Sequence, residues 1–179
     1  MEGIMEGIME GRTVEHSAVT MSAVMMPHQA NPYGNVHGGE TMKLMDTAAG
    51  VAALRHSHAN VVTARVEGIN FYAPIRVGNF VVIDAQLTFV SRSTMEVRVE
   101  VFAEEVRRET KHHALTAYFV MVALDDEGKP TEVPPLILSS SKEKELWEQG
   151  KLRYQACKGE ISDGEDTFNI CREGPLPEV

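Results

Sequence analysis

The fold is decided by residues 31–56, NPYGNVHGGETMKLMDTAAGVAALRH. Turn-forming residues fill the first part, Asn31–Gly39, and a helical pattern of apolar residues follows over Glu40–Arg55. At roughly 100° per residue, Asp46 lies within about 60° of Met42 and therefore on the apolar side of this helix. The opposite side is apolar as well, so we expect a helix that is buried nearly all round.

Asp46 is the residue of this helix that most needs an explanation. A carboxylate among apolar neighbours costs free energy unless it is paired or takes part in chemistry. Small residues, among them Ala48, Ala49 and Gly50, would let another layer of structure approach the helix closely. The sequence therefore predicts a functional carboxylate on a closely packed helix.

Length and composition are those of an ordinary soluble domain. The 179 residues suffice for one domain with a sizeable core. The net charge of −9 argues against nucleic acid or an anionic membrane as the main partner, so an anionic ligand needs a local basic cluster. No apolar run has membrane-spanning length and no secretory signal is found, so we expect a cytoplasmic protein. The two cysteines have no histidine beside them, which predicts no metal site.

Predicted strands occupy most of the chain after the central helix. The first twelve residues repeat the unit Met-Glu-Gly-Ile, so 1–12 is expected to be a loose tail, and the acidic segment 159–179 is expected to be disordered. A first strand is predicted between Thr13 and Met26. Further strands are predicted at Asn60–Phe71, Phe80–Val90, Thr94–Ala103 and His113–Leu124, and a helix with a capping box at Ser140–Lys158.

These elements together predict the fold class. Gly68 interrupts a strand and predicts a bend or bulge there. Residues 94–103 alternate between apolar and charged side chains, which predicts an antiparallel strand with one solvated face. One long helix and a run of successive strands predict an α+β fold, with a curved antiparallel sheet wrapped around the helix. An exposed edge of such a sheet favours dimerisation.

Several blocks of the sequence resemble, in the same order, the acyl-CoA hydrolase branch of the hotdog-fold thioesterases, which includes the cytosolic, brain-type hydrolases. The blocks are Gly34–Gly39, Met42–Asp46, Val61–Val66, Ile69–Phe71, Phe89–Ser93 and Gly128–Pro130, with a C-terminal helix over Glu143–Lys158. The resemblance implies a hotdog thioesterase domain at residues 13–137 and a C-terminal helix at 138–158. The mammalian relatives carry two such domains per chain, whereas this sequence contains one.

The resemblance implies hydrolysis of a fatty acyl-CoA thioester to free acid and coenzyme A. No further cofactor is expected, because coenzyme A is part of substrate and product. By that likeness Asp46 activates water or attacks the thioester itself, and Asn35 of the partner subunit orients the water or the substrate. A homodimer would be the minimal active unit and a trimer of dimers, a hexamer, the expected assembly. The N–H of Gly39, where the helix begins, is the expected oxyanion donor.

The coenzyme A half of such a substrate needs its own contacts. Its phosphates need cations, for which Arg92, flanked by the hydroxyls of Ser91 and Ser93, is the first candidate and Arg65 the second. The pantetheine arm is expected along one strand backbone, at Val62, Thr63 and Ala64.

Other interpretations stay open at several positions. Asn31 is more typical of a local Asx turn than of a ligand contact, and Asn35 is also a common turn former. His37 is expected to be structural, and His56 and His58 are expected in a surface loop. The main functional alternative is a regulatory protein that binds acyl-CoA without turnover. The length of the acyl chain is not encoded in any pattern of the sequence.

Overall fold

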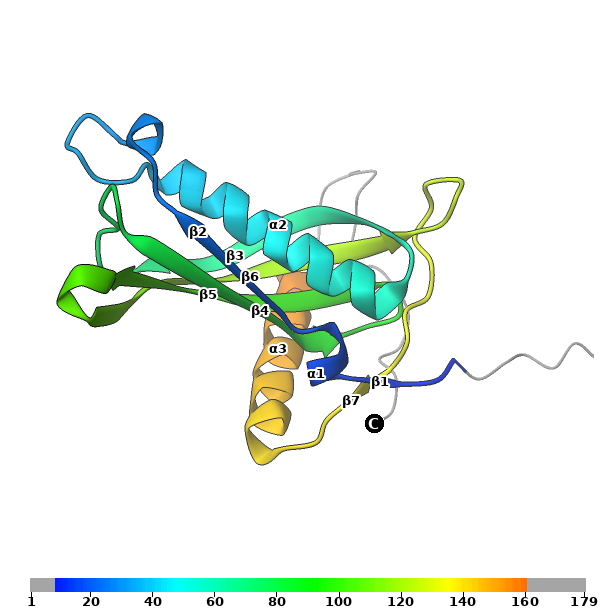
Figure 1. Cartoon of the computed structure of the whole chain (residues 1–179). Helices are drawn as coiled ribbons and strands as arrows, with labels where there is room; N and C mark the ends of the chain where they lie inside the picture. Colours follow the sequence, from blue (N-terminus) through cyan, green and yellow to red (C-terminus); the bar gives the residue numbers. More distant parts are fainter. Residues whose placement is uncertain (1–8, 161–179) are drawn as a thin grey trace, which may run out of the picture.

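The structure, a computed structural model, describes residues 9–160 (Figure 1). Its elements in chain order are β1 (Arg12–Thr13), α1 (Val14–Ser17), β2 (Val19–Val24), the 3-10 turn η1 (Pro27–Gln29), α2 (Gly38–Ser57), β3 (Asn60–Phe71), β4 (Phe80–Val90), β5 (Thr94–Glu105), the 3-10 turn η2 (Val106–Arg108), β6 (Thr110–Leu124), β7 (Leu136–Ile137) and α3 (Ser141–Glu160). Most of the two predicted tails, 1–12 and 159–179, lies outside the described residues.

Five strands form one antiparallel sheet in the order β2-β4-β5-β6-β3. α2 lies along one face of this sheet and α3 crosses the other (Figure 1). The predicted α+β architecture, a sheet wrapped around one long helix, is confirmed. β2 and β3 are the edges, and β3 shifts register twice along β6. Gly68, with φ of 56°, lies in the second shift, which confirms the predicted bulge.

One side of α2 builds the core against the sheet. Met45, Ala48 and Ala49 are fully buried, and the small alanines let the helix lie close to the strands. The predicted burial all round is wrong for the single chain, because Asp46 is exposed and Leu54 is 48% exposed. The sheet covers only one side of the helix, and no element of the described chain covers the other.

α3 packs its aromatic side chains on the outer face of the sheet. The rings of Trp147 and Tyr154 lie 5.4 and 5.3 Å from the ring of Phe89. A Cβ atom on Gly150 would come within 2.7 Å of the Phe89 Cβ, so glycine is needed where the helix backbone approaches β4. The predicted C-terminal helix is therefore confirmed, and it belongs to the packed domain.

α3 also covers a charged side chain of β5. Glu96 is 5% exposed and accepts hydrogen bonds from Arg153 Nε and Nη2, both at 2.8 Å, and from Thr88 Oγ1 at 2.5 Å. Arg153 stacks on the ring of Tyr118 at 3.9 Å, and its hydrogen bonds to Glu96 raise its pKa. The predicted solvated face of this strand is therefore wrong here. Alternation along one strand does not reveal a helix that packs on its polar side.

The N-terminal part of the described chain also departs from the prediction. Val14–Ser17 forms a helical turn in place of strand, because the Thr13 hydroxyl caps it by accepting the His16 N–H at 3.2 Å. Before it, Arg12 donates hydrogen bonds to the carbonyl oxygens of Arg55 and His56 where α2 ends. A cation matches the negative end of a helix dipole. Arg12 therefore belongs to the folded domain and not to the predicted tail.

His56 is fully buried, so its predicted place in a surface loop is wrong, whereas His58 is exposed. The ring Nε2 of His56 donates to the carbonyl oxygen of Pro134 at 2.9 Å. Within residues 9–160, its Nδ1 has no hydrogen-bond partner. Burial lowers the pKa of His56, and the nearby charges of Arg12, His16 and His58 lower it further. The folded protein thus favours the neutral ring at this position, although the hydrogen bond to Pro134 raises the pKa in part.

The pH dependence of stability is predicted to report on His56. Above a pH of about 6.5 the ring is neutral in the folded and the unfolded chain. Below it, the unfolded chain takes up a proton that the folded chain resists, so the free energy of unfolding falls by at most about 1.4 kcal/mol per pH unit. His56→Gln keeps a donor for Pro134 and should flatten this decline. Urea unfolding at fixed protein concentration measures it, with the exposed His16→Gln as control. An unchanged pH slope in His56→Gln would contradict the assignment.

Candidate active site

Asp46 is held by a hydroxyl of the neighbouring strand. The Oγ1 of Thr63 on β3 donates a hydrogen bond of 2.5 Å to Asp46 Oδ1. β3 is an edge of the sheet, and both residues are exposed in the single chain. The second carboxylate oxygen, Oδ2, accepts no hydrogen bond within residues 9–160. The pair therefore presents a fixed, ionisable carboxylate at an open edge of the domain.

The loop before α2 is ordered by the side chain of Asn31. Its Oδ1 accepts hydrogen bonds from the backbone N–H groups of Tyr33 at 2.9 Å and Asn35 at 3.2 Å. This is the Asx turn that the sequence predicts. The backbone of Asn35 forms an antiparallel bridge with Arg76, which joins the loop to the segment after β3.

A pocket of about 290 Å³ opens beside this loop. It is lined by Asn31, Asn35, Val36, Gly38, Thr41, Phe71, Ala73, Pro74 and Ile75. Both candidate asparagines and the start of α2 therefore face one space, with apolar side chains around them.

The N-terminus of α2 contains one engaged and one open N–H group. His37 is the N-cap, and its ring Nδ1 accepts the N–H of Gly39 at 3.0 Å. The predicted structural role of His37 is confirmed. The predicted oxyanion donor, Gly39 N–H, is occupied by this bond, whereas Gly38 N–H has no acceptor within residues 9–160. A Cβ atom on Gly38 would lie 3.3 Å from the Phe71 ring, so glycine leaves the narrow space between the helix start and this ring open.

The loop and the carboxylate lie apart in one chain. Gly38 and Asp46 belong to the same helix and are separated by eight residues, which corresponds to about 12 Å along the axis. The pocket at the helix start and the Asp46–Thr63 pair are thus two separate places in one subunit, here termed half-sites. A site shared between subunits, as predicted, needs two such separate places in each subunit, because each subunit then supplies one place to each site.

Contrary to the prediction, the side chain of Arg65 does not lie near Asp46. It forms an ion pair with Glu67, and its Nη1 contacts the Sγ of Cys157 on α3 at 2.7 Å. Thr63 faces α2, but the register shift that leaves Ala64 unpaired turns Arg65 to the opposite face of the sheet. Arg65 therefore serves the packing of α3. Val62 and Ala64 lie half-buried on the edge strand, and their contact with pantetheine stays a prediction.

The predicted phosphate contacts Ser91, Arg92 and Ser93 lie at the β4–β5 turn, but the two serines are buried. Ser91 and Ser93 are 4% and 1% exposed, so their hydroxyls do not face solvent beside Arg92. Arg92 is exposed, and its carbonyl oxygen accepts the Val133 N–H at 2.9 Å. The burial of the two serines does not fit a phosphate site made by all three residues.

Among residues 9–160, no group of three His, Cys, Asp or Glu side chains is placed to hold a metal ion. Over the same range, every helix is too short or too polar to cross a membrane.

Known proteins resemble this chain in sequence. The sequence profile described as thioesterase superfamily matches residues 33–110. The cytosolic acyl coenzyme A thioester hydrolase of Rattus norvegicus is 41% identical over 151 residues, which cover 83% of this chain and 40% of the rat protein. The chain thus spans less than half the length of that relative. The acyl-CoA thioester hydrolase YciA of Escherichia coli is 32% identical over 124 residues, which cover 68% of this chain and 94% of the bacterial protein.

Solved structures share the fold. An apo-hexameric acyl-CoA thioesterase has a TM-score of 0.81 at 27% identity, covering 86% of this chain and 98% of its own. The acyl-CoA hydrolase of Staphylococcus aureus, in complex with butyryl coenzyme A and coenzyme A, has a TM-score of 0.77 at 29% identity, covering 83% and 90%. Three alanine variants of that hydrolase are also solved, each replacing one asparagine, aspartate or threonine.

Proposed function

Because the chain belongs to the thioesterase superfamily, we propose that it hydrolyses the thioester bond of fatty acyl-coenzyme A to free fatty acid and coenzyme A. The observation that carries the proposal is the carboxylate of Asp46, fixed by the Thr63 hydroxyl at the open edge of the sheet. Thioester hydrolysis needs a base or nucleophile, a donor for the developing oxyanion and a pocket for the acyl chain. The described residues offer a candidate for each.

Asp46 activates the attacking water or attacks the thioester carbon directly. Its Oδ1 is held by Thr63, which leaves Oδ2 to accept the proton or to form the new bond. The spacing of the replaced residues in the Staphylococcus hydrolase supports this pair. Its aspartate and threonine are seventeen residues apart, as Asp46 and Thr63 are here. Thr63 is therefore a positioning residue for Asp46, a role that differs from the backbone contact predicted from the sequence.

The same comparison favours Asn31 over Asn35 as the asparagine of the site. The replaced asparagine of the Staphylococcus hydrolase precedes its aspartate by fifteen residues, as Asn31 precedes Asp46, whereas Asn35 precedes Asp46 by eleven. Both asparagines line the pocket where α2 begins. The Oδ1 of Asn31 is held by two backbone N–H groups, so its Nδ2 is the atom left to donate to water or substrate. Asn35 then supports the turn.

Gly38 N–H is our oxyanion donor in place of Gly39 N–H. It lies at the positive end of the α2 dipole and lines the same pocket as Asn31. Removing one such donor typically costs about 3 kcal/mol of transition-state stabilisation. No metal or cofactor takes part in these steps.

The proposed active unit is a homodimer in which Asn31 and Gly38 of one subunit meet Asp46 and Thr63 of the other. The separation of the half-sites along α2 supports this sharing. The hexameric relative supports a trimer of dimers as the full assembly, and the name of the rat relative supports a cytoplasmic location.

Thiol release across a series of acyl-CoA substrates, from acetyl-CoA to palmitoyl-CoA, tests the function. We expect hydrolysis with a maximum at one range of chain lengths, because a pocket of fixed size favours one acyl length. Binding of every acyl-CoA without thiol release would contradict the proposal and support the regulatory alternative.

A further inference from the structure

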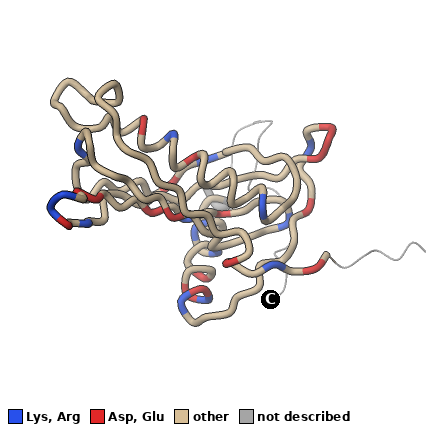
Figure 2. The backbone as a smooth tube through the Cα atoms, viewed as in Figure 1, with Lys and Arg blue, Asp and Glu red and all other residues tan. Residues whose placement is uncertain are grey.

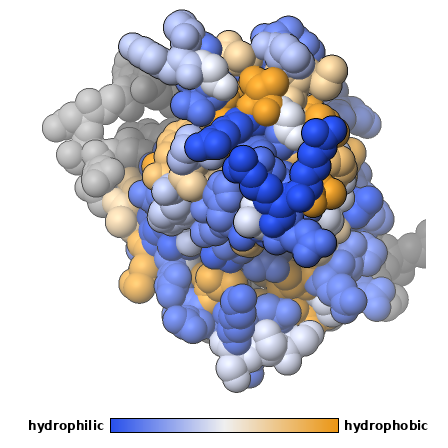
Figure 3. Space-filling view, turned by 60° about the vertical axis from the view of Figure 1, so that its left-hand side comes forward, coloured by the Kyte–Doolittle hydropathy of each residue, from blue (hydrophilic) through white to orange (hydrophobic). Residues whose placement is uncertain are grey.

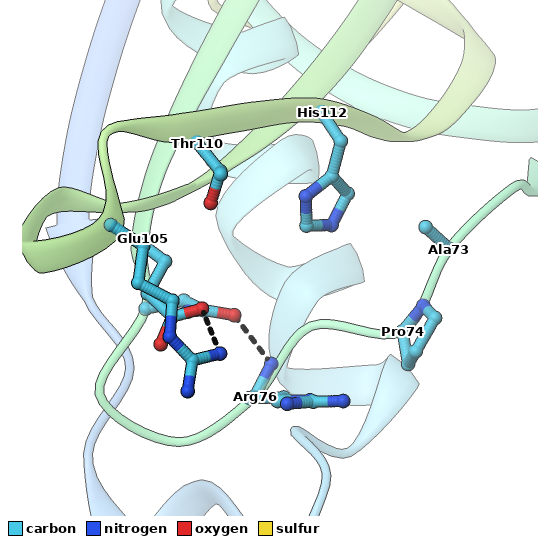
Figure 4. A pocket seen from close by; sticks show the side chains of 8 residues that line it. Ala73, Pro74, Arg76, Glu105, Thr110 and His112 are labelled. Atoms are coloured by element: carbon cyan, nitrogen blue, oxygen red, sulfur yellow. Dashed lines mark hydrogen bonds and ion pairs between the residues drawn. The ribbon is translucent and has the colours of Figure 1, made fainter.

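The end of the molecule beside the β5–β6 hairpin contains a second pocket, of about 360 Å³ (Figure 4). It is lined by Ala73, Pro74, Arg76, Asn79, Glu105, Arg108, Thr110 and His112. Basic and acidic residues gather at this hairpin tip (Figure 2), and strongly hydrophilic side chains lie near the centre of this end of the molecule (Figure 3). The pocket is thus a polar site in a chain whose net charge is −9.

Hydrogen-bond donors dominate this pocket. Arg108 donates to Glu105 through one contact of 3.3 Å, and within residues 9–160 the guanidinium of Arg76 has no acceptor. Thr110 and His112 are two residues apart on β6, and both side chains project toward Arg76 (Figure 4). Glu105 is the one carboxylate of the lining, and it is engaged by Arg108.

The donors are held in place by the backbone. Asn79 Oδ1 accepts the Arg76 N–H at 2.8 Å and closes the turn after β3. The backbone of Arg76 is bridged to that of Asn35. Two planar guanidinium groups that face a hydroxyl and an imidazole (Figure 4) suit the oxygens of a phosphate group. The chemistry of the pocket is therefore that of a phosphate site.

This second pocket adjoins the half-site at the start of α2. Ala73 and Pro74 line both pockets, so they form the wall between them. A ligand whose thioester lies at Gly38 can therefore extend past this wall into the group of donors. We propose that Arg76, Arg108, Thr110 and His112 bind the nucleotide phosphates of the coenzyme A substrate. This inference rests on the proposed function. It gives to this pocket the phosphate-binding role that the sequence predicts for Arg92.

Arg76→Ala and Arg108→Ala test the assignment, with Arg107→Ala as the matched control. Arg107 is exposed on the same turn, η2, but does not line the pocket. Each pocket variant should raise KM for acyl-CoA about tenfold and leave kcat unchanged, because a charged hydrogen bond to phosphate is equally strong in the ground and transition states. An acyl-pantetheine thioester, which lacks the nucleotide, should be hydrolysed as by the wild type. That second substrate also verifies that the variants are folded.

Calorimetric titration with adenosine 3′,5′-bisphosphate forms the second arm. The bisphosphate should bind the wild type and Arg107→Ala, and binding should weaken about tenfold in each pocket variant. Lost nucleotide binding with an unchanged KM for acyl-CoA would overturn the assignment, because the pocket would then bind a free nucleotide and not the substrate. Pocket variants that match the wild type in every assay would overturn it as well.

The same measurements separate this inference from the proposed function. If the wild type releases thiol while the pocket variants behave normally, the function stands and the phosphate assignment is wrong. If the wild type hydrolyses no acyl-CoA but binds the bisphosphate through Arg76 and Arg108, the pocket stands as a nucleotide phosphate site and the hydrolase assignment is wrong.

Discussion

Asp46→Asn is expected to remove nearly all thioester hydrolysis while the fold and the assembly stay intact. The amide has the shape of the carboxylate and can still accept the hydrogen bond from Thr63, but it cannot take up a proton or attack the thioester. Loss of a general base typically costs about 100-fold to 10,000-fold in rate. Thiol release and circular dichroism on the same sample measure the effect.

Two substitutions at Thr63 serve as controls for this result. Thr63→Ser keeps the hydroxyl and should retain most of the activity. Thr63→Val removes the hydrogen bond to Asp46 Oδ1 and should lower kcat more than it changes KM, since it leaves the carboxylate present but unfixed. Turnover by Asp46→Asn within about tenfold of the wild type would rule out Asp46 as the base or nucleophile.

Mixed dimers are expected to recover activity from two inactive parents. In a homodimer, the substitution Asn31→Ala is present in both shared sites and inactivates both. The same holds for Asp46→Ala. In a mixed dimer one shared site inherits both lesions and the other inherits neither. Activity should therefore return to about half of the wild-type value per mixed dimer if the two sites act independently. Co-expression with two different affinity tags isolates the mixed species for the assay.

The same mixing experiment distinguishes the two asparagines. Asn35→Ala subunits are mixed with Asp46→Ala subunits in parallel, and we expect the Asn35→Ala homodimer itself to keep substantial activity. An inactive Asn35→Ala homodimer whose activity returns on mixing, beside an active Asn31→Ala homodimer, would restore the original prediction. Verified mixed dimers that stay inactive with both asparagine variants would show that the site is not shared between subunits.

The sequence by itself determined the order and type of the main elements. The helix from Gly38 to Ser57 and the strands from Asn60 to Leu124 follow from apolar spacing and from glycine and proline positions, which act over short distances. Asp46 could be selected as the key residue because it lies on the apolar side of the helical pattern, although the structure leaves it exposed in the single chain. The turn at Asn31 and the structural role of His37 were also local and therefore predictable.

Only the tertiary structure decided which groups meet. The Thr63 hydroxyl reaches Asp46 and Arg65 faces away because one bulge at Ala64 reverses the faces of β3, and no spacing rule predicts that bulge. α3 buries Glu96 because helix and strand are brought together from distant parts of the chain. Local patterns report what each segment prefers. Which side chain lies at the open edge and which lies under a helix depends on contacts between segments, and these form only when the sheet closes around α2.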